Sequence, residues 1–148
     1  MLKGINPLLN ADVLRVLRAM GHGDDLIIAD TNFPSDSVAK KTVYGRLLRI
    51  DANAAEVVEA VLSLMPIDTF VDDAAARMEV VGEPAAILPV MDEVQAKVSA
   101  AEGPNPMMSI ERFAFYERAK NAYAVIQTGE RRFYGCFAFR KGVIGPDG

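Results

Sequence analysis

Four stretches of the chain carry apolar residues at helical spacing. In the first, apolar side chains recur every three or four residues after Asn10, a residue type that often caps helices: Val13, Leu14, Leu17 and Met20. Gly21 follows, and we expect it to end this helix in the left-handed conformation. In total the spacing predicts helices over residues 11–20, 54–65, 90–100 and 109–122.

Four shorter apolar runs lack that spacing and predict strands, over residues 25–30, 46–51, 123–127 and 134–139. The first contains four consecutive apolar residues, which is typical of a strand buried on both faces. Only a short turn separates the last two strands, so we expect them to pair antiparallel within a mixed sheet. Strands that alternate with helices predict an α/β fold: a single layered domain over residues 1–148, with a mixed β-sheet flanked by helices.

Composition narrows the classes of function. A net charge of −4 argues against nucleic acid or an anionic membrane as the main partner. No run approaches the roughly 18 apolar residues of a membrane span, and the amino terminus does not resemble a signal peptide. The chain has one cysteine, Cys136, so no internal disulfide can form. A protein of the reducing cytoplasm is the simplest expectation.

The first candidate site surrounds His22, the only histidine, which lies between Gly21 and Gly23. Imidazole is the one side chain that ordinarily titrates near neutral pH, which suits proton transfer. The alternative is a capping role at the carbonyl end of the preceding helix. Asp30 follows the strand at 25–30, and open α/β sheets bind ligands at the carboxyl ends of their strands. An aspartate here can also simply form a turn.

Two later segments add further candidates. Arg112 stands among aromatic residues, where its rigid fork of donors can hold hydroxyls or carboxylates, or can face solvent. Tyr134, Gly135 and Cys136 follow a charged turn, and a glycine inside a strand indicates a bulge or a close approach of backbone to ligand. Alternatively, Tyr134 packs on the sheet. Cys136 is expected to be a small buried residue.

The same residues limit the kind of chemistry. One histidine and one cysteine make a zinc site built on histidines very unpromising, and we predict no metal. The motif "GHGD" lacks the spacing of a phosphate loop, and no nucleotide fingerprint is present. What remains is a His, Asp, Arg and Tyr set without a cofactor. Such a set can move protons and hold hydroxyl groups.

Three blocks of the sequence, "MLKGINPLL", "MGHGDDLIIADTNFP" and "RFAFYERAKNAYAVIQTGERRFYG", resemble the ribose pyranase / fucose mutarotase family, with its L-fucose branch the nearest. The resemblance runs nearly end to end. It implies interconversion of the α and β anomers of a monosaccharide through the open-chain aldehyde. It also implies a homo-oligomer, because family members form rings, often decamers, with sites close to subunit boundaries.

The resemblance also assigns roles to residues. His22 would transfer protons, and Tyr134 would share in that transfer or donate a hydrogen bond. The sugar would be held by Asp30, Arg112, Tyr134, Gly135 and Cys136. The L-fucose branch usually has asparagine where this chain has Cys136, which weakens the expectation for the substrate more than that for the reaction. A sugar-binding or regulatory module without turnover and a ribose-type pyranase are the alternatives.

Overall fold

The computed structural model describes all of residues 1–148, and its six strands form one mixed sheet in the order β2-β5-β1-β6-β3-β4. Five strands run in the same direction, and β6 runs opposite to its neighbours β1 and β3. The strands are β1 (Asp25–Ala29), β2 (Leu47–Ile50), β3 (Ala75–Met78), β4 (Met108–Ile110), β5 (Ala124–Thr128) and β6 (Phe137–Arg140).

Five helices connect and cover these strands: α1 (Ala11–Ala19), α2 (Ser35–Ala39), α3 (Ala54–Leu62), α4 (Pro89–Glu102) and α5 (Arg112–Lys120). The cap expected at Asn10 is present, and a second asparagine caps α3. The Asn10 side chain accepts a hydrogen bond from the Val13 amide, and Asn53 forms a reciprocal capping box with Glu56. None of the helices combines the length and the apolar content that a membrane crossing requires.

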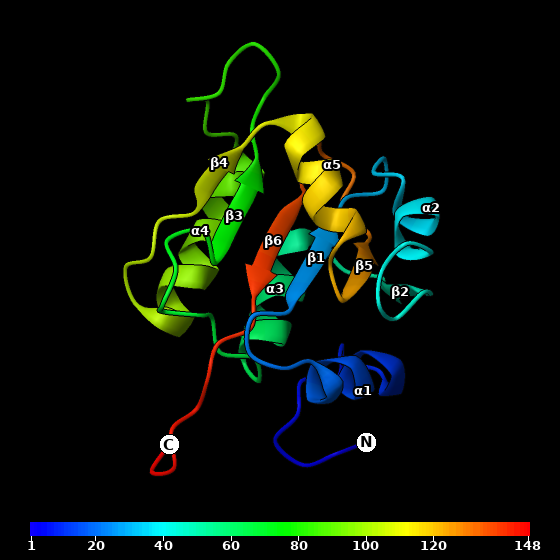
Figure 1. The fold of residues 1–148 in the computed structure, drawn as a ribbon, viewed down its shortest axis with the longest axis vertical. Helices are drawn as coiled ribbons and strands as arrows, with labels where there is room; N and C mark the ends of the chain where they lie inside the picture. The colour runs from blue at the N-terminus through cyan, green and yellow to red at the C-terminus, as the bar shows by residue number, and fades with distance from the viewer.

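Side chains on the two faces of the sheet form two separate cores. In β1, Leu26 and Ile28 belong to the core shared with α1, α3 and α4, whereas Ile27 and Ala29 belong to the core shared with α2 and α5. Burial on both faces explains why this strand is apolar without alternation. Figure 1 shows α5 in front of the sheet and α3 behind it. The predicted layered α/β fold with a mixed sheet is therefore confirmed.

The expectation that β6 pairs with β5 is wrong. The strand β6 lies between β1 and β3, and it is antiparallel to both. The strand β3 was not predicted, because its sequence, Ala-Ala-Arg-Met, contains no β-branched or aromatic residue. Because β3 is not predicted, the pattern favours β5, the strand nearest in sequence, as the partner of β6.

Two segment boundaries also differ from the prediction. Residues 109 and 110, expected at the start of a helix, belong to the edge strand β4, and the helix begins after Glu111, whose carboxylate caps it. Residues 134–136, expected in the last strand, precede β6 as a loop. Tyr134 there has a positive φ of 61°, which a strand does not allow.

The turn after α1 uses a different glycine from the one expected. The left-handed residue is Gly23, with φ of 87°, and not Gly21. The Asp24 amide donates to the Gly21 carbonyl, so residues 21–24 form a tight turn that needs a positive φ at its third position. This turn leaves His22 at the amino end of β1.

Candidate active site

A pocket of about 290 Å³ opens at the carboxyl edge of the parallel strands. Its volume lies at the lower limit of the range for ligand pockets, about 300–1,000 Å³, and therefore suits a small ligand. Because β6 runs opposite to its neighbours, its amino end reaches the same edge as the carboxyl ends of β1 and β3. The lining residues are Asp30, Asn32, Phe33, Met78, Arg112, Tyr116, Phe133, Tyr134 and Cys136.

The Asp30 carboxylate organises the floor of this pocket. Its Oδ1 accepts hydrogen bonds from the amides of Asn32 and Phe33, each at 2.9 Å. Its Oδ2 accepts from the Gly135 amide at 3.1 Å and from the Cys136 thiol at 3.5 Å. Asp30 therefore forms a turn and also lines the pocket, whereas its binding of a ligand stays a prediction.

The loop before β6 brings three expected residues to Asp30. Gly135 approaches closely enough that a Cβ there would lie 2.8 Å from Glu130 Cγ and 3.3 Å from Asp30 Cβ. The glycine is thus required by a close approach of protein segments, and not by a bulge in a strand. Burial, together with the adjacent carboxylate, raises the pKa of the Cys136 thiol well above its ordinary value. Cys136 is a neutral buried thiol, as expected.

Arg112 and Tyr116 form the wall contributed by α5. They lie one turn apart, and Arg112 Nε donates to the Tyr116 hydroxyl at 3.3 Å. The guanidinium carbon also lies 5.5 Å from the centroids of the Phe113 and Tyr116 rings. Both side chains line the pocket, and Arg112 forms no ion pair that would neutralise its charge.

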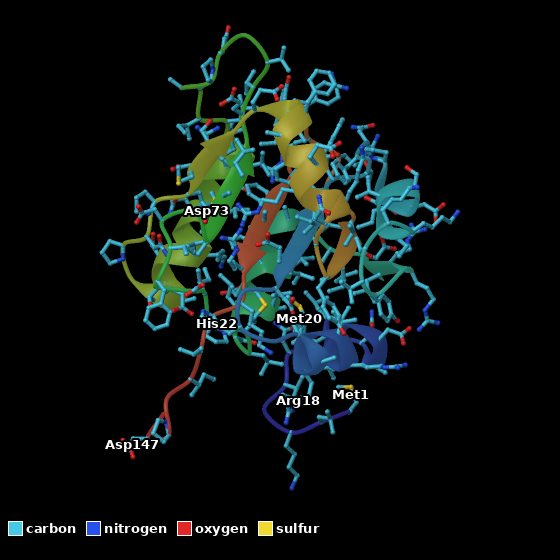
Figure 2. All side chains as sticks on the ribbon, viewed as in Figure 1. Met1, Arg18, Met20, His22, Asp73 and Asp147 are labelled. Carbon is cyan, nitrogen blue, oxygen red and sulfur yellow. The ribbon has the colours of Figure 1, made fainter.

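His22 does not lie in this pocket. His22 precedes β1, whereas Asp30 follows it. Because β1 has five residues, its two ends lie about 16 Å apart. Figure 2 shows His22 at the end of the sheet near α1. The imidazole Nε2 is 3.1 Å from Asp68 Oδ2, and the Phe70 ring packs edge-on at 5.6 Å. Hydrogen bonding from the Phe70 amide and from His22 lowers the pKa of Asp68.

A capping role for His22 is not realised in the fold. Lys141 from the chain beyond β6 donates to the carbonyls of Leu17 and Met20 at the end of α1. The imidazole is instead half-exposed and bonded to Asp68 alone. The structure contains no group of three or more His, Cys, Asp or Glu side chains placed to hold a metal ion.

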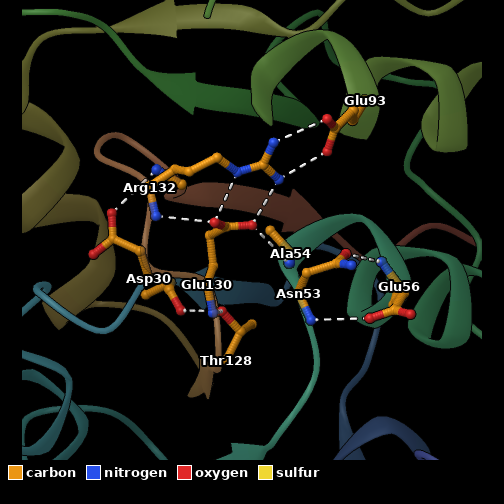
Figure 3. Close-up of polar contacts among 10 residues, drawn as sticks. Asp30, Asn53, Ala54, Glu56, Glu93, Thr128, Glu130 and Arg132 are labelled. Carbon is orange, nitrogen blue, oxygen red and sulfur yellow. Dashed lines mark hydrogen bonds and ion pairs between the residues drawn. The ribbon is translucent and has the colours of Figure 1, made fainter. Parts of the chain in front are cut away.

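A charged network lies immediately behind the pocket (Figure 3). The Glu130 carboxylate is 4% exposed and accepts three hydrogen bonds from Arg132, through its amide, Nε and Nη2, each at 2.9 Å. The Ala54 amide at the start of α3 adds a fourth at 3.4 Å. Arg132 also forms a bidentate pair with Glu93 of α4, at 2.8 and 2.9 Å. The hydrogen bonds from Arg132 and from the Ala54 amide lower the pKa of Glu130 to about 2.

The folded protein should lose stability in acid through Glu130. Because the folded-state pKa of about 2 lies below the ordinary 4.5, the ionised carboxylate stabilises the fold fully above pH 4.5, and this contribution is lost as the pH falls towards 2. We expect it to be about 2 kcal/mol, after allowance for solvent screening at the half-exposed Arg132. Urea unfolding at several pH values should show that Glu130→Gln removes this part of the pH dependence. A variant that retains the full acid dependence would contradict the assignment, and Glu59→Gln, in an exposed ion pair with Lys97, is the matched control.

Several lining residues were not expected from the sequence. Tyr116 was given no role at the site, although its position four residues after Arg112 places both on one helix face. Phe133 adjoins Tyr134 and carried no separate signal. Met78 belongs to the unpredicted β3, and Asn32 and Phe33 lie in the loop that follows Asp30.

Comparison with known proteins yields a consistent set of relatives. The fucose mutarotase of Danio rerio is 43% identical to this chain, over 99% of this chain and 96% of its own length. The crystal structure of the protein Atu2016 is 60% identical, with a TM-score of 0.96 over 98% of this chain and 97% of that one. The fucose mutarotase from Streptococcus pneumoniae, solved in complex with L-fucose, is 35% identical, with a TM-score of 0.86 over 97% and 100% of the two chains.

The family match covers almost the whole sequence. Residues 3–144 match the family described as the RbsD / FucU transport protein family. This match and the near-complete coverage of the fucose mutarotase relatives confirm the resemblance noted in the three sequence blocks. The chain belongs to the RbsD / FucU transport protein family.

Proposed function

We infer that the protein is a sugar mutarotase that interconverts the α and β anomers of L-fucose or a closely related monosaccharide. The observation that carries this inference is the pocket at the carboxyl edge of the sheet, in a chain whose full-length relatives bear the name fucose mutarotase. The pocket offers a carboxylate, a guanidinium and two phenol hydroxyls, and Phe33, Met78 and Phe133 add apolar surface to its lining. A pyranose sugar has the matching character, with hydroxyls at its edge and C–H groups on its faces.

Asp30 is the proposed anchor for a sugar hydroxyl. An ionised carboxylate has about four acceptor positions, and three are taken by backbone amides. The fourth is held by the Cys136 thiol, which is a weak donor. A sugar hydroxyl is a stronger donor and would displace the thiol from Oδ2. Arg112 and Tyr134 would then bind oxygens at the opposite edge of the ring.

Anomer exchange needs proton transfer in both directions. Ring opening protonates the ring oxygen and takes a proton from the anomeric hydroxyl, and closure on the other face of the aldehyde reverses both transfers. The best catalyst for this is a group that ordinarily titrates near the working pH. Imidazole is the side chain that ordinarily meets this need, and the lining of the pocket in one chain contains no histidine. His22 is the proposed proton-transfer residue, and Tyr134 assists it as a hydrogen-bond donor or second proton carrier.

His22 acts, in this proposal, on the pocket of a neighbouring subunit. Proton transfer needs a heavy-atom separation of about 2.6–3.2 Å, which the length of β1 forbids within one chain. Exposed apolar rings flank both places: Phe70 beside His22, and Phe133 at the pocket. Contact between these two different surfaces is head-to-tail, and such contacts form a ring when the rotation from one subunit to the next closes, which we propose here. A homo-oligomeric ring therefore completes the site.

Nuclear magnetic resonance tests the proposed function directly. Saturation transfer between the anomeric protons of L-fucose should be faster with the protein than in buffer alone. A panel that includes D-ribose separates a fucose mutarotase from a ribose-type pyranase. If calorimetry finds sugar binding but no sugar in the panel exchanges its anomers faster than in buffer, the protein is a binding module. This alternative is suggested by Cys136, which stands where the L-fucose branch usually has asparagine.

Substitution of Cys136 should have a small effect on exchange. The thiol makes only one weak hydrogen bond, so Cys136→Ala is expected to change the rate of L-fucose exchange by no more than about threefold. Cys136→Asn restores the residue usual in the L-fucose branch and supplies an amide that competes for Asp30. The sugar panel, measured on both variants, checks this expectation. Loss of all exchange in Cys136→Ala would show that the thiol itself contacts the reacting atoms.

A further inference from the structure

We infer that Arg132, held between Glu130 and Glu93, is a positioning residue that sets the Tyr134–Gly135 backbone against Asp30. The inference deepens the proposed sugar site and rests on it for the kinetic consequences, whereas its structural consequence can be measured without a sugar. Neither Glu93, Glu130 nor Arg132 lines the pocket, so any effect on the reaction must pass through the residues that do.

The backbone of Glu130 is hydrogen-bonded to the residues on either side of Asp30, at Thr31 directly and at Ala29 through Thr128. Its carbonyl accepts from the Thr31 amide at 2.9 Å, directly after Asp30. Its own amide donates at 3.1 Å to Thr128 Oγ1, which in turn donates to the Ala29 carbonyl at 2.9 Å. The backbone of Glu130 is therefore fixed to the carboxyl end of β1, within one residue of the carboxylate that anchors the sugar in the proposal.

The side chain of Glu130 then fixes Gly135. Glu130 Cγ packs so closely against Gly135 that a Cβ on residue 135 would lie only 2.8 Å from it. Gly135 is held from the other side by the hydrogen bond of its amide to Asp30 Oδ2. A shift of the Glu130 side chain would release this packing and lengthen that hydrogen bond. The position of Glu130 thus controls the distance between Gly135 and Asp30.

Arg132 fixes the Glu130 side chain and ties it to α4. Its guanidinium uses one edge for both oxygens of Glu130 and another for both oxygens of Glu93. Only a planar fork with five donors can hold two carboxylates in this way, and a lysine ammonium cannot. Two residues further on, Tyr134 adopts a positive φ of 61°, a conformation that persists where the surroundings enforce it. The hydrogen bond from the Val81 amide to the Tyr134 hydroxyl restrains the far end of that side chain.

Hydrogen exchange of single amides tests the positioning role without a ligand. In Arg132→Met, the Gly135 amide should exchange about tenfold faster or more, while the Ile28 amide in β1 reports any loss of global stability. Arg132→Lys should give an intermediate result, and it also serves if Arg132→Met does not fold. Lys97→Met is the matched control. It also removes an ion pair of α4, with Glu59, but this pair makes no hydrogen bond to the loop that contains Gly135.

The kinetic arm uses the folded variants and L-fucose. Misplacement of reacting groups by about 1 Å can cost on the order of 100-fold, so kcat for anomer exchange should fall about 10- to 100-fold in Arg132→Met with a smaller rise in KM. Guanidinium ion at low concentration should restore part of the rate in this variant and none in Lys97→Met. An unchanged Gly135 amide, or equal acceleration at Gly135 and Ile28, would overturn the inference. A wild-type protein without exchange would refute the proposed function, and the amide measurement would still decide the role of Arg132.

Discussion

Replacing His22 with alanine should lower the catalysed rate of L-fucose anomer exchange by about 100- to 10,000-fold, the usual contribution of a positioned acid–base group. The fold should survive, because the side chain is half-exposed and makes a single hydrogen bond, to Asp68. Saturation-transfer resonance measures the rate, and calorimetry checks that the sugar still binds. A variant with the full wild-type rate would exclude His22 as the proton-transfer residue.

A mixing experiment decides whether His22 serves a neighbouring subunit. Arg112→Met should inactivate the sugar pocket while leaving His22 intact, and it should fold because Arg112 bonds only to Tyr116. When inactive His22→Ala and inactive Arg112→Met chains are co-assembled, some sites combine an intact His22 with an intact Arg112 from another chain. Up to about one quarter of the wild-type rate should return if assembly is random. Absence of any recovery in mixed oligomers would place both residues at one site within a chain, or His22 outside the reaction.

Replacing Asp30 with alanine should destabilise the protein more than any other single change at the pocket. Three backbone amides would lose their acceptor in a buried place, and each buried unsatisfied donor costs about 1–3 kcal/mol. We expect a loss of at least about 3 kcal/mol in the free energy of unfolding, measured with urea. L-fucose binding should be lost at the same time, because the carboxylate is its proposed anchor.

Asp30→Asn separates these two effects. The amide oxygen can keep the position of Oδ1 and its bonds to Asn32 and Phe33, but the NH₂ group would then face the Gly135 amide, donor against donor. Stability should fall by less than in Asp30→Ala, whereas the sugar should still bind poorly. Wild-type stability in Asp30→Ala would mean that the loop amides find other partners, and the proposed floor of the pocket would be wrong.

Elements with a strong local signal were predicted well from the sequence. Helix α1 begins after Asn10 and α3 after Asn53, because a side-chain cap acts within three residues of its own position. The strand β1 was visible from four consecutive apolar residues that are buried on both faces. In contrast, Ala75–Met78 owes its strand conformation to pairing with β4 and β6, and small residues carry no β signal of their own.

The candidate site was likewise predicted in part: most of its polar residues were chosen from the sequence, but their grouping was not. Asp30, Arg112, Tyr134 and Cys136 were each chosen from the sequence, and all four line one pocket. Their grouping depends on the antiparallel insertion of β6 between β1 and β3, which brings Gly135 to within 3.1 Å of a carboxylate 105 residues earlier. Tyr116 and Met78 were not chosen, because a pocket wall and a core position look alike in a single sequence.

The apolar strand, the Asn10 helix cap, the family and the residues proposed to hold a sugar could all be inferred from the amino-acid sequence, since each inference depends on residue identity or on neighbours a few positions away. The fold was needed to place His22 and Asp30 at opposite ends of β1, and to show that Arg132 links Glu130 to Glu93 behind the pocket. The physical reason is strand order. Hydrogen bonds between strands join segments far apart in the chain, and no local pattern specifies which edge of the sheet two distant side chains will share.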